Sequence, residues 1–259
     1  MTPEEQFTFD LEGYLVVRGA LSSDEVQHLN GLADEIWPGD FDEKGFRSTG
    51  AVSKWGPDFL NLIDHPAIVP YLLGLLGPKF RIDHDYCIFM REAGINAGDG
   101  NLHGGPQGGR HLEADHWYTH QNGTMRNGLM VFTYCLSDAK AGDGGFACVP
   151  GSHKSNFVAN MPDKVRSFEE PAHYVSQPPV QAGDLIIFTE ALVHGTQPWK
   201  GTQDRRSLLI KYSPGHSSWA STYYNADEYP GITDQQRRIM LPPAIGSRPD
   251  SIETPAAAG

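Results

Sequence analysis

From residue 80 onward the chain contains a succession of short segments with the composition of β-strands, and this pattern constrains the fold more than any other feature. The segments are rich in β-branched and aromatic residues, and glycine-rich turns such as residues 142–145 and 182–184 separate them. Spaced strands that follow helical patterns are typical of an all-β core supported by helices. We therefore expect a mainly β fold, a jelly roll or a sandwich, with strands at residues 80–91, 129–136, 145–149, 184–188 and 206–213.

The helical patterns lie in the first 80 residues, after an expected strand at residues 13–18. Ser22 and Glu25 have the spacing of a capping box, and apolar residues then recur at helical spacing over residues 26–36. A second helix is expected over residues 66–77, where an internal proline shortens or kinks it. These helices are predicted to support one side of the β core.

Length and composition indicate one globular domain. A chain of 259 residues with 39% hydrophobic residues, 29 glycines and 19 prolines suits a single core with many turns. We expect this domain to span residues 1–240 and the Pro- and Ala-rich residues 241–259 to form a flexible tail. No apolar run approaches a membrane span, and the start lacks the features of a secretory signal, so we expect a cytoplasmic protein without membrane contact.

Charge and cysteine content exclude several kinds of function. A formal net charge of −12 opposes binding to nucleic acid polymers, because phosphate backbones are held mainly by Lys and Arg. A small anionic ligand remains compatible with this charge wherever basic residues gather. Cys87, Cys135 and Cys148 are widely spaced and form no CxxC pair, which argues for reduced core thiols rather than a disulfide framework or a zinc site.

Two histidines, His103 and His194, stand in segments that read as strand ends. Many mononuclear iron(II) oxygenases hold their metal with a His-x-Asp/Glu pair on one strand and a distant histidine. Residues i and i+2 point the same way on a strand, so such a pair aims both ligands at one metal. Here the second position is Gly105, which carries no carboxylate. The pattern predicts an iron site with two protein ligands and a vacancy for a small anion such as chloride.

A rival ligand set also has the His-x-carboxylate form. His111 and Glu113 are spaced in this way, and Asp115 is a further carboxylate nearby. If His111 and Glu113 bind iron together with His194, the triad is complete and hydroxylation is expected.

Two arginines follow His194 in the sequence. A guanidinium group can clamp a carboxylate through two parallel hydrogen bonds, so Arg205 or Arg206 suits the distal carboxylate of 2-oxoglutarate. One sequence leaves the choice between the two open.

Three blocks of sequence resemble the phytanoyl-CoA dioxygenase family of iron(II)/2-oxoglutarate oxygenases. They are Gly-Gly-Phe-Ala-Cys-Val-Pro-Gly-Ser-His-Lys at 144–154, Ala-Gly-Asp-Leu-Ile-Ile-Phe at 182–188, and the His-Gly-Thr that begins at His194. The resemblance implies a double-stranded β-helix, a cupin-like jelly roll, with iron(II), 2-oxoglutarate and O2 at its mouth. It implies that His194 is the distal iron ligand, that Arg205 with Thr133 contacts 2-oxoglutarate, and that His153 is a structural turn residue.

The segment His103-Gly104-Gly105 resembles the halogenase branch of these enzymes, in which glycine or alanine replaces the carboxylate and chloride binds iron. This resemblance implies chlorination of an unactivated C–H bond, and it extends to halogenases that act on deoxyadenosine monophosphate in antibiotic biosynthesis. An anionic substrate of the nucleotide kind is then expected. Basic and aromatic residues of the long stretch 94–128 are its candidate contacts, namely Arg110, His111, His116, Trp117, Tyr118 and Arg126.

The sequence thus leads to a halogenase as the first hypothesis, with iron(II), 2-oxoglutarate, chloride and O2 as its cofactors and co-substrates. The alternative is a hydroxylase of the same family that uses His111 and Glu113. A third hypothesis is a binding protein that retains the barrel without turnover.

Overall fold

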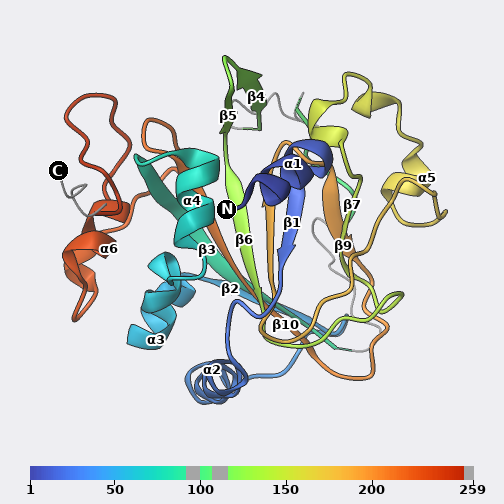
Figure 1. Ribbon diagram of the computed structural model, residues 1–259. Coiled ribbons are helices and arrows are strands. Elements are labelled where there is room, and N and C mark those ends of the chain that lie inside the picture. Colours follow the sequence, from blue (N-terminus) through green and yellow to red (C-terminus); the bar gives the residue numbers. More distant parts are fainter. Residues whose placement is uncertain (92–99, 107–115, 254–259) are drawn as a thin grey trace.

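A six-stranded antiparallel sheet with the strand order β1-β8-β6-β10-β3-β2 forms the body of the protein (Figure 1). The computed structural model describes residues 1–91, 100–106 and 116–253. A second sheet pairs β7 with β9, and a hairpin pairs β4 with β5. The strands are β1 (Tyr14–Val17), β2 (Phe46–Gly50), β3 (Phe80–Met90), β4 (Tyr118–Gln121), β5 (Thr124–Asn127), β6 (Met130–Cys135), β7 (Gly145–Cys148), β8 (Leu185–Thr189), β9 (His194–Gln197) and β10 (Arg205–Pro214).

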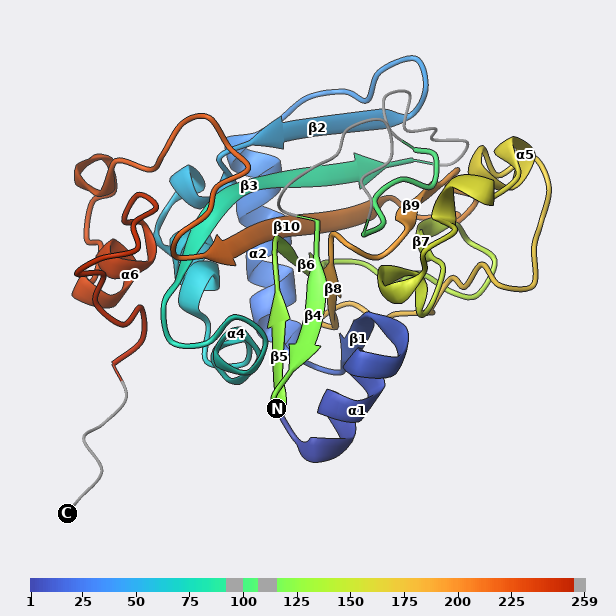
Figure 2. The same cartoon turned by 90° about the horizontal axis from the view of Figure 1, so that it is seen from above.

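The predicted mainly β fold is confirmed, and each of the five strands expected after residue 80 is present. The hairpin β4–β5 was not foreseen, because its Thr-, His- and Asn-containing strands lack the apolar alternation that marks a half-buried strand. It lies within the long stretch 94–128, where no strand was expected. Figure 2 shows β2, β3 and β10 side by side, with the hairpin projecting from the sheet.

The two faces of the large sheet bury different side chains, because successive residues of a strand alternate between faces. On one face Phe132 of β6 and Ile210 of β10 pack among the helices. On the other face Val131 and Leu209 pack toward the β7–β9 sheet, together with Cys148 of β7. The space between the two sheets is where the candidate site lies.

Helices cover the first of these faces (Figure 1). The predicted capping box is confirmed, since Ser22 Oγ accepts from the Glu25 amide and Glu25 Oε2 accepts from the Ser22 amide. The second predicted helix begins later than expected, at Val69, with Pro70 in its first turn. The helices are α1 (Pro3–Glu12), α2 (Ser23–Ile36), α3 (Pro57–Leu60), α4 (Val69–Leu76), α5 (Asp163–Arg166) and α6 (Asp234–Ile239), with 3-10 turns at Val52–Trp55, Asn61–Asp64, Ser152–Lys154, Val158–Asn160 and Ala226–Glu228.

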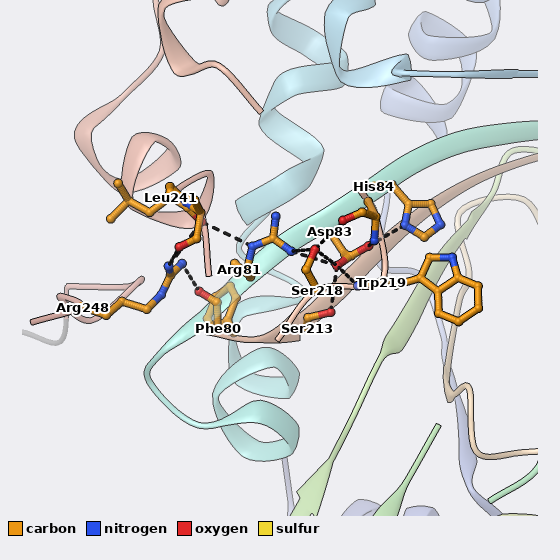
Figure 3. A network of polar contacts seen from close by, with 11 residues as sticks. Phe80, Arg81, Asp83, His84, Ser213, Ser218, Trp219, Leu241 and Arg248 are labelled. Atoms are coloured by element: carbon orange, nitrogen blue, oxygen red, sulfur yellow. Dashed lines mark hydrogen bonds and ion pairs between the residues drawn. The ribbon is translucent and has the colours of Figure 1, made fainter. Parts of the chain in front are cut away.

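Part of the segment expected to be a flexible tail is held against β3, which corrects that expectation for residues 241–253. Arg248 is 4% exposed, and its guanidinium donates to the carbonyl oxygens of Phe80 and Pro242 (Figure 3). Ser251 is also buried and bonds the same Phe80 carbonyl. The composition of the tail predicted mobility, but a buried arginine that satisfies several carbonyl groups ties it down.

No single helix within the described residues is long and apolar enough to cross a membrane. Two short pieces, Pro57–Asp64 and Val69–Leu76, reach such a length and composition only together, across a bend of 44°. Ile63 and Leu72, one from each piece, are fully buried in the hydrophobic core.

Candidate active site

His103 and His194 lie side by side as a hydrogen-bonded antiparallel pair. The His103 amide donates to the His194 carbonyl at 2.8 Å, and the His194 amide donates to the His103 carbonyl at 2.9 Å. Directly opposed residues of such a pair place their side chains on the same face. The two ring centroids are 4.4 Å apart. The fold therefore brings together the two histidines that the sequence singled out.

Backbone carbonyl groups orient both imidazole rings. The Nδ1 atom of His103 lies 2.7 Å from the Asn101 oxygen, and that of His194 lies 2.8 Å from the Leu192 oxygen. A carbonyl oxygen only accepts, so each Nδ1 carries the proton and each Nε2 presents its lone pair. Burial lowers the pKa of His194 to about 3, which keeps this ring neutral. Both rings are thus prepared to bind a cation through Nε2.

The chain leaves the extended conformation directly after His103. Gly104 and Gly105 have φ angles of +79° and +102°, so the i, i+2 rule for a strand does not apply to residue 105. A Cβ atom at Gly105 would lie 3.2 Å from Val158 Cγ1 and 3.4 Å from Val193 Cγ2. The position expected to leave a vacancy beside the metal is therefore bounded by valine methyl groups.

A carboxylate that the sequence reasoning missed lies next to His194. Glu190 is 3% exposed, and its Oε2 is 3.7 Å from His194 Nε2 and 3.6 Å from His116 Nε2. Its Oε1 forms an ion pair with Lys211 Nζ at 2.6 Å. Burial raises the pKa of the Glu190 carboxyl, but its neighbours, above all the Lys211 ammonium group, outweigh burial and hold this pKa below its usual range. Glu190 is accordingly an ionised group within the site.

One signal in the sequence pointed to this residue. Glu190 is the first charged residue after the apolar strand β8, and it stands four positions before His194 in the turn between β8 and β9. A charged residue is rarely buried without a partner. The partner, Lys211, is near the far end of β10, and no sequence pattern relates the two.

The structure separates the two arginines at the start of β10. Arg206 points to α2, where Nη2 lies 2.7 Å from Asp34 Oδ1, and its guanidinium stacks 5.1 Å over the Phe89 ring. Arg205 points to the other face, where it is 7% exposed, with its Nη1 3.7 Å from Met90 Sδ. No carboxylate of the described residues forms an ion pair with Arg205.

A glycine creates the room that Arg205 occupies. Gly145 of β7 has a φ of +81°, and a Cβ atom there would lie 2.7 Å from Arg205 Nε. Phe146, the next residue, packs on Phe188, and Phe188 in turn contacts the His194 ring at 4.6 Å between centroids. Arg205 and His194 therefore lie on the same side of the large sheet, and His103 is exposed beside His194.

Thr133 of β6 is buried opposite Leu209, and its hydroxyl has no hydrogen-bond partner among the described residues. Val131 and Leu209, in line with it on the same face, both pack toward the β7–β9 sheet. An unpaired buried hydroxyl costs free energy unless a ligand satisfies it. Thr133 thus has an unsatisfied hydroxyl, and Arg205 has a buried guanidinium with no carboxylate partner among the described residues; both suit the distal carboxylate expected for 2-oxoglutarate.

The expected substrate contacts are placed in different surroundings. His116 lies in the site, beside Glu190, and stacks on Trp219 with centroids 5.4 Å apart. Tyr118 instead donates its hydroxyl to Asp10 of α1, so it joins the hairpin to the N-terminal helix. Trp117 is half-buried beside β4 and Arg126 is exposed on β5, while Arg110, His111, Glu113 and Asp115 lie outside the described residues.

Asp83 positions the loop that carries Trp219. Its buried carboxylate accepts from the Trp219 amide at 2.9 Å and the Ala220 amide at 3.0 Å, and Arg81 pairs with it at 2.8 Å (Figure 3). Backbone and side-chain donors lower the pKa of Asp83 despite its burial, which tends to raise it. This network holds Trp219 where it can cover His116.

The donor set fits iron and 2-oxoglutarate in part. Within residues 1–91, 100–106 and 116–253, no group of three or more His, Cys, Asp or Glu side chains is arranged to hold a metal ion. The imidazoles of His103 and His194 nevertheless match two of the three metal ligands of such a centre, and Arg205 is buried on the same side of the large sheet as His194.

Comparisons with known proteins find a family match for part of the chain and solved structures with a similar fold. Residues 101–207 match the sequence model of the Phytanoyl-CoA dioxygenase (PhyH) family, and no curated protein matches the chain. HygX from Streptomyces hygroscopicus, solved with nickel and 2-oxoglutarate bound, is 24% identical with a TM-score of 0.73, over 84% of this chain and 89% of HygX.

Two further solved structures share the fold at lower identity. The α-ketoglutarate-dependent carbocyclase SnoK from nogalamycin biosynthesis is 18% identical with a TM-score of 0.63, over 98% and 94% of the two chains. EctD from S. alaskensis, solved with 2-oxoglutarate and 5-hydroxyectoine, is 17% identical with a TM-score of 0.58, over 82% and 76%. These structures show the fold that the chain shares with them, and the family match covers residues 101–207.

Proposed function

We propose that the chain is an iron(II)/2-oxoglutarate-dependent oxygenase that hydroxylates a C–H bond of a small polar metabolite. The observation that carries this proposal is the placement of His103 beside His194, with Arg205 buried on the same side of the large sheet as His194. When bound, iron(II) with 2-oxoglutarate activates dioxygen and supplies the oxidant for the C–H bond.

The chain's own residues would have separate tasks. The Nε2 atoms of His103 and His194 would hold the metal, and Arg205 with Thr133 would hold the distal carboxylate of 2-oxoglutarate. A bidentate arginine fixes the orientation of a carboxylate as well as its position. Phe188, in contact with His194, would exclude water from one side of the metal.

Halogenation is the second candidate outcome. The glycine at residue 105 favours it, because no carboxylate follows His103 in the usual position. Chloride would then occupy a coordination position, and the product would carry chlorine. Hydroxylation is the better supported outcome because the ionised Glu190 carboxylate already lies beside His194 and would repel a second anion there.

A small anionic metabolite, such as a nucleotide, is the substrate class that we propose for screening. Lys211 is half-buried in the site, where its Nζ pairs with Glu190, and the indole of Trp219 stacks on His116 and is 45% exposed. An aromatic face and an ammonium group together can bind a base and a phosphate. Deoxyadenosine monophosphate is the first compound to test.

Anaerobic titration with iron(II) and 2-oxoglutarate tests the proposal. The wild-type protein should develop the weak visible absorption band of an iron(II)–2-oxoglutarate chelate, and His194→Ala should not. A product mass increased by one oxygen, with or without added chloride, would support hydroxylation. A chlorine-containing product would establish the second candidate, and absence of the band in the wild-type protein would refute both.

A further inference from the structure

We propose that His84 and Trp219 form a recognition site for the substrate, one that takes a planar heterocyclic ring carrying an N–H donor. Trp219 would stack on the ring, and His84 Nε2 would accept the hydrogen bond. This inference rests on the proposed function, and it names the chemical feature by which the same site selects its substrate.

Both side chains are held by one buried carboxylate, that of Asp83. Its Oδ1 lies 2.8 Å from His84 Nδ1. Its Oδ2 accepts from the Trp219 amide at 2.9 Å and from Arg81 Nη1 at 2.8 Å. Figure 3 shows the imidazole of His84 and the indole of Trp219 on the same side of this network. The position of each side chain is therefore fixed relative to the other.

A β-bulge in β3 places His84 on the side of the sheet that faces the site. Lys211 of β10 pairs with His84 and Tyr212 pairs with Ile82, so Asp83 is the extra residue of the bulge. Bulges occur next to active sites, where they re-aim a side chain. Residues that directly oppose each other in an antiparallel pair have side chains on the same face. His84 therefore shares its face with Lys211.

Two series of contacts connect the recognition site to the candidate metal ligand. Lys211 Nζ pairs with Glu190 Oε1 at 2.6 Å, and Glu190 Oε2 is 3.7 Å from His194 Nε2. In the second series, Trp219 stacks on His116 with 18° between the ring planes, and His116 Nε2 is 3.6 Å from Glu190 Oε2. Both sides of the proposed recognition site thus reach the carboxylate next to His194.

The indole of Trp219 is accessible to a second stacked ring. The contact with His116 covers one of its faces, and 45% of the residue is still exposed. Because Asp83 holds its amide and His116 holds its ring, a ligand that stacks here orders little of the protein. Stacking on an aromatic side chain is a common means of binding a nucleic acid base. Trp219 is therefore suited to a planar ring.

His84 presents an acceptor in a fixed direction. The ionised carboxylate of Asp83 only accepts, so His84 Nδ1 carries the proton and Nε2 of the neutral ring offers a lone pair. The imidazole also stacks on Tyr86, with 6.0 Å between centroids and 14° between planes. The His84 side chain is 29% exposed, so a ligand can reach Nε2. An N–H or amino group on a stacked ring is the matching donor.

Ligand analogues test the site in the wild-type protein loaded with Mn(II) and 2-oxoglutarate. Isothermal titration calorimetry should show binding of deoxyadenosine monophosphate. Deoxyribose 5-phosphate lacks the ring, and purine deoxyriboside monophosphate lacks the amino group. Each should bind about tenfold more weakly or worse. Equal affinity for all three compounds, or no binding of deoxyadenosine monophosphate, would overturn the inference.

Replacement of Trp219 tests the stacking surface. Trp219→Leu should weaken the binding of deoxyadenosine monophosphate by about tenfold or more and leave that of deoxyribose 5-phosphate unchanged. Tyr223→Leu is the matched control, because this aromatic residue of the same loop is 50% exposed but lies over Arg81, at 5.3 Å. It should bind both compounds as wild type does. A loss in both variants, or in neither, would contradict the assignment of Trp219.

Replacement of His84 tests the acceptor. His84→Asn keeps an amide donor near the position of Nδ1 for Asp83 and removes Nε2. The variant should no longer distinguish deoxyadenosine monophosphate from purine deoxyriboside monophosphate. If it retains the wild-type preference, His84 only supports Asp83 and the inference fails. Thermal unfolding of each metal-free variant reports on folding, and the analogue comparison in the wild-type protein decides the question even if a variant does not fold.

Failure of this inference is distinct from failure of the proposed function. If the wild-type protein forms no iron(II)–2-oxoglutarate chelate, the proposed function fails, whatever the affinities for the three compounds. If the chelate forms but binding does not depend on the ring and its amino group, the recognition site alone is refuted.

Discussion

Replacing Arg205 by methionine is expected to separate ligand binding from the stability of the metal-free protein. Its guanidinium is buried, and no carboxylate of the described residues pairs with it. Burial lowers the pKa of this group, a sign that the charge is poorly compensated. Removal of an uncompensated buried charge in favour of a hydrophobic residue of similar volume is neutral or stabilising. We therefore expect the melting temperature of metal-free Arg205→Met to equal or exceed that of wild type.

The same change should abolish binding of 2-oxoglutarate at ordinary concentrations. Loss of one partner from a buried, hydrogen-bonded ion pair costs about 3–5 kcal/mol. At about 1.4 kcal/mol for each tenfold change in affinity, the dissociation constant for 2-oxoglutarate should rise between roughly 10²- and 10⁴-fold. A ligand at about 100 times its dissociation constant stabilises a protein by about 2.7 kcal/mol, and this shift should vanish in the variant.

Thermal unfolding with the redox-inert ion Mn(II), with and without 2-oxoglutarate, measures both effects. Arg206→Met is the matched control, because the neighbouring arginine binds Asp34 on the opposite face. Loss of that partly exposed ion pair should cost at most about 1 kcal/mol and leave the 2-oxoglutarate shift unchanged. If Arg205→Met keeps the full shift, or if Arg206→Met loses it, the assignment of the two faces of β10 is refuted.

Three further changes test other parts of the structure. Gly145→Ala should lower the free energy of unfolding by about 1 kcal/mol or more, because residue 145 has a φ of +81°. It should also raise the concentration of 2-oxoglutarate needed for binding, because the new methyl group would displace Arg205. An unchanged affinity for 2-oxoglutarate would count against this contact. Gly105→Asp should destabilise the protein without tightening iron(II) binding, since its side chain would start among valine methyl groups; a gain in iron affinity would show that residue 105 faces the metal. Burial lowers the pKa of His153 to about 4, below its unfolded value of about 6.5, so the unfolded state takes up a proton first as the pH falls. As the pH falls between those two pKa values, the free energy of unfolding should therefore drop by up to about 1.4 kcal/mol per pH unit. Urea unfolding at several pH values should show a smaller dependence of this free energy on pH for His153→Gln than for wild type. An equal pH dependence would exclude His153 as its cause.

Most of the fold could be predicted because its signals are local. The strand at residues 184–188 is a continuous apolar run bounded by turn residues, and the helix after Ser22 begins with a capping box. Both signals depend on neighbouring residues only. The hairpin β4–β5 and the burial of Arg248 were not predicted, because they depend on contacts with distant parts of the chain.

The residues of the candidate site likewise fall into those that local sequence signals predicted and those that depend on distant contacts. Residue types and order along the chain sufficed to select His103 and His194, because their sequence surroundings could be compared with the ligand pattern of mononuclear iron(II) oxygenases. The choice between Arg205 and Arg206 depended on which face of β10 meets the second sheet, and only the packed structure contains that information.

Glu190 and Gly105 show the physical reason most clearly. The i, i+2 rule holds for an extended strand, and two positive φ angles after His103 remove residue 105 from its reach. The carboxylate next to His194 comes instead from a turn that the packing of two sheets brings to the site, where Lys211 compensates its buried charge. Local chemistry along the chain was enough to select the two histidines and the pair of arginines as candidate groups. Which of those groups share one point in space follows only from long-range pairing of strands, because that pairing sets the faces, the burial and the partners of each charge.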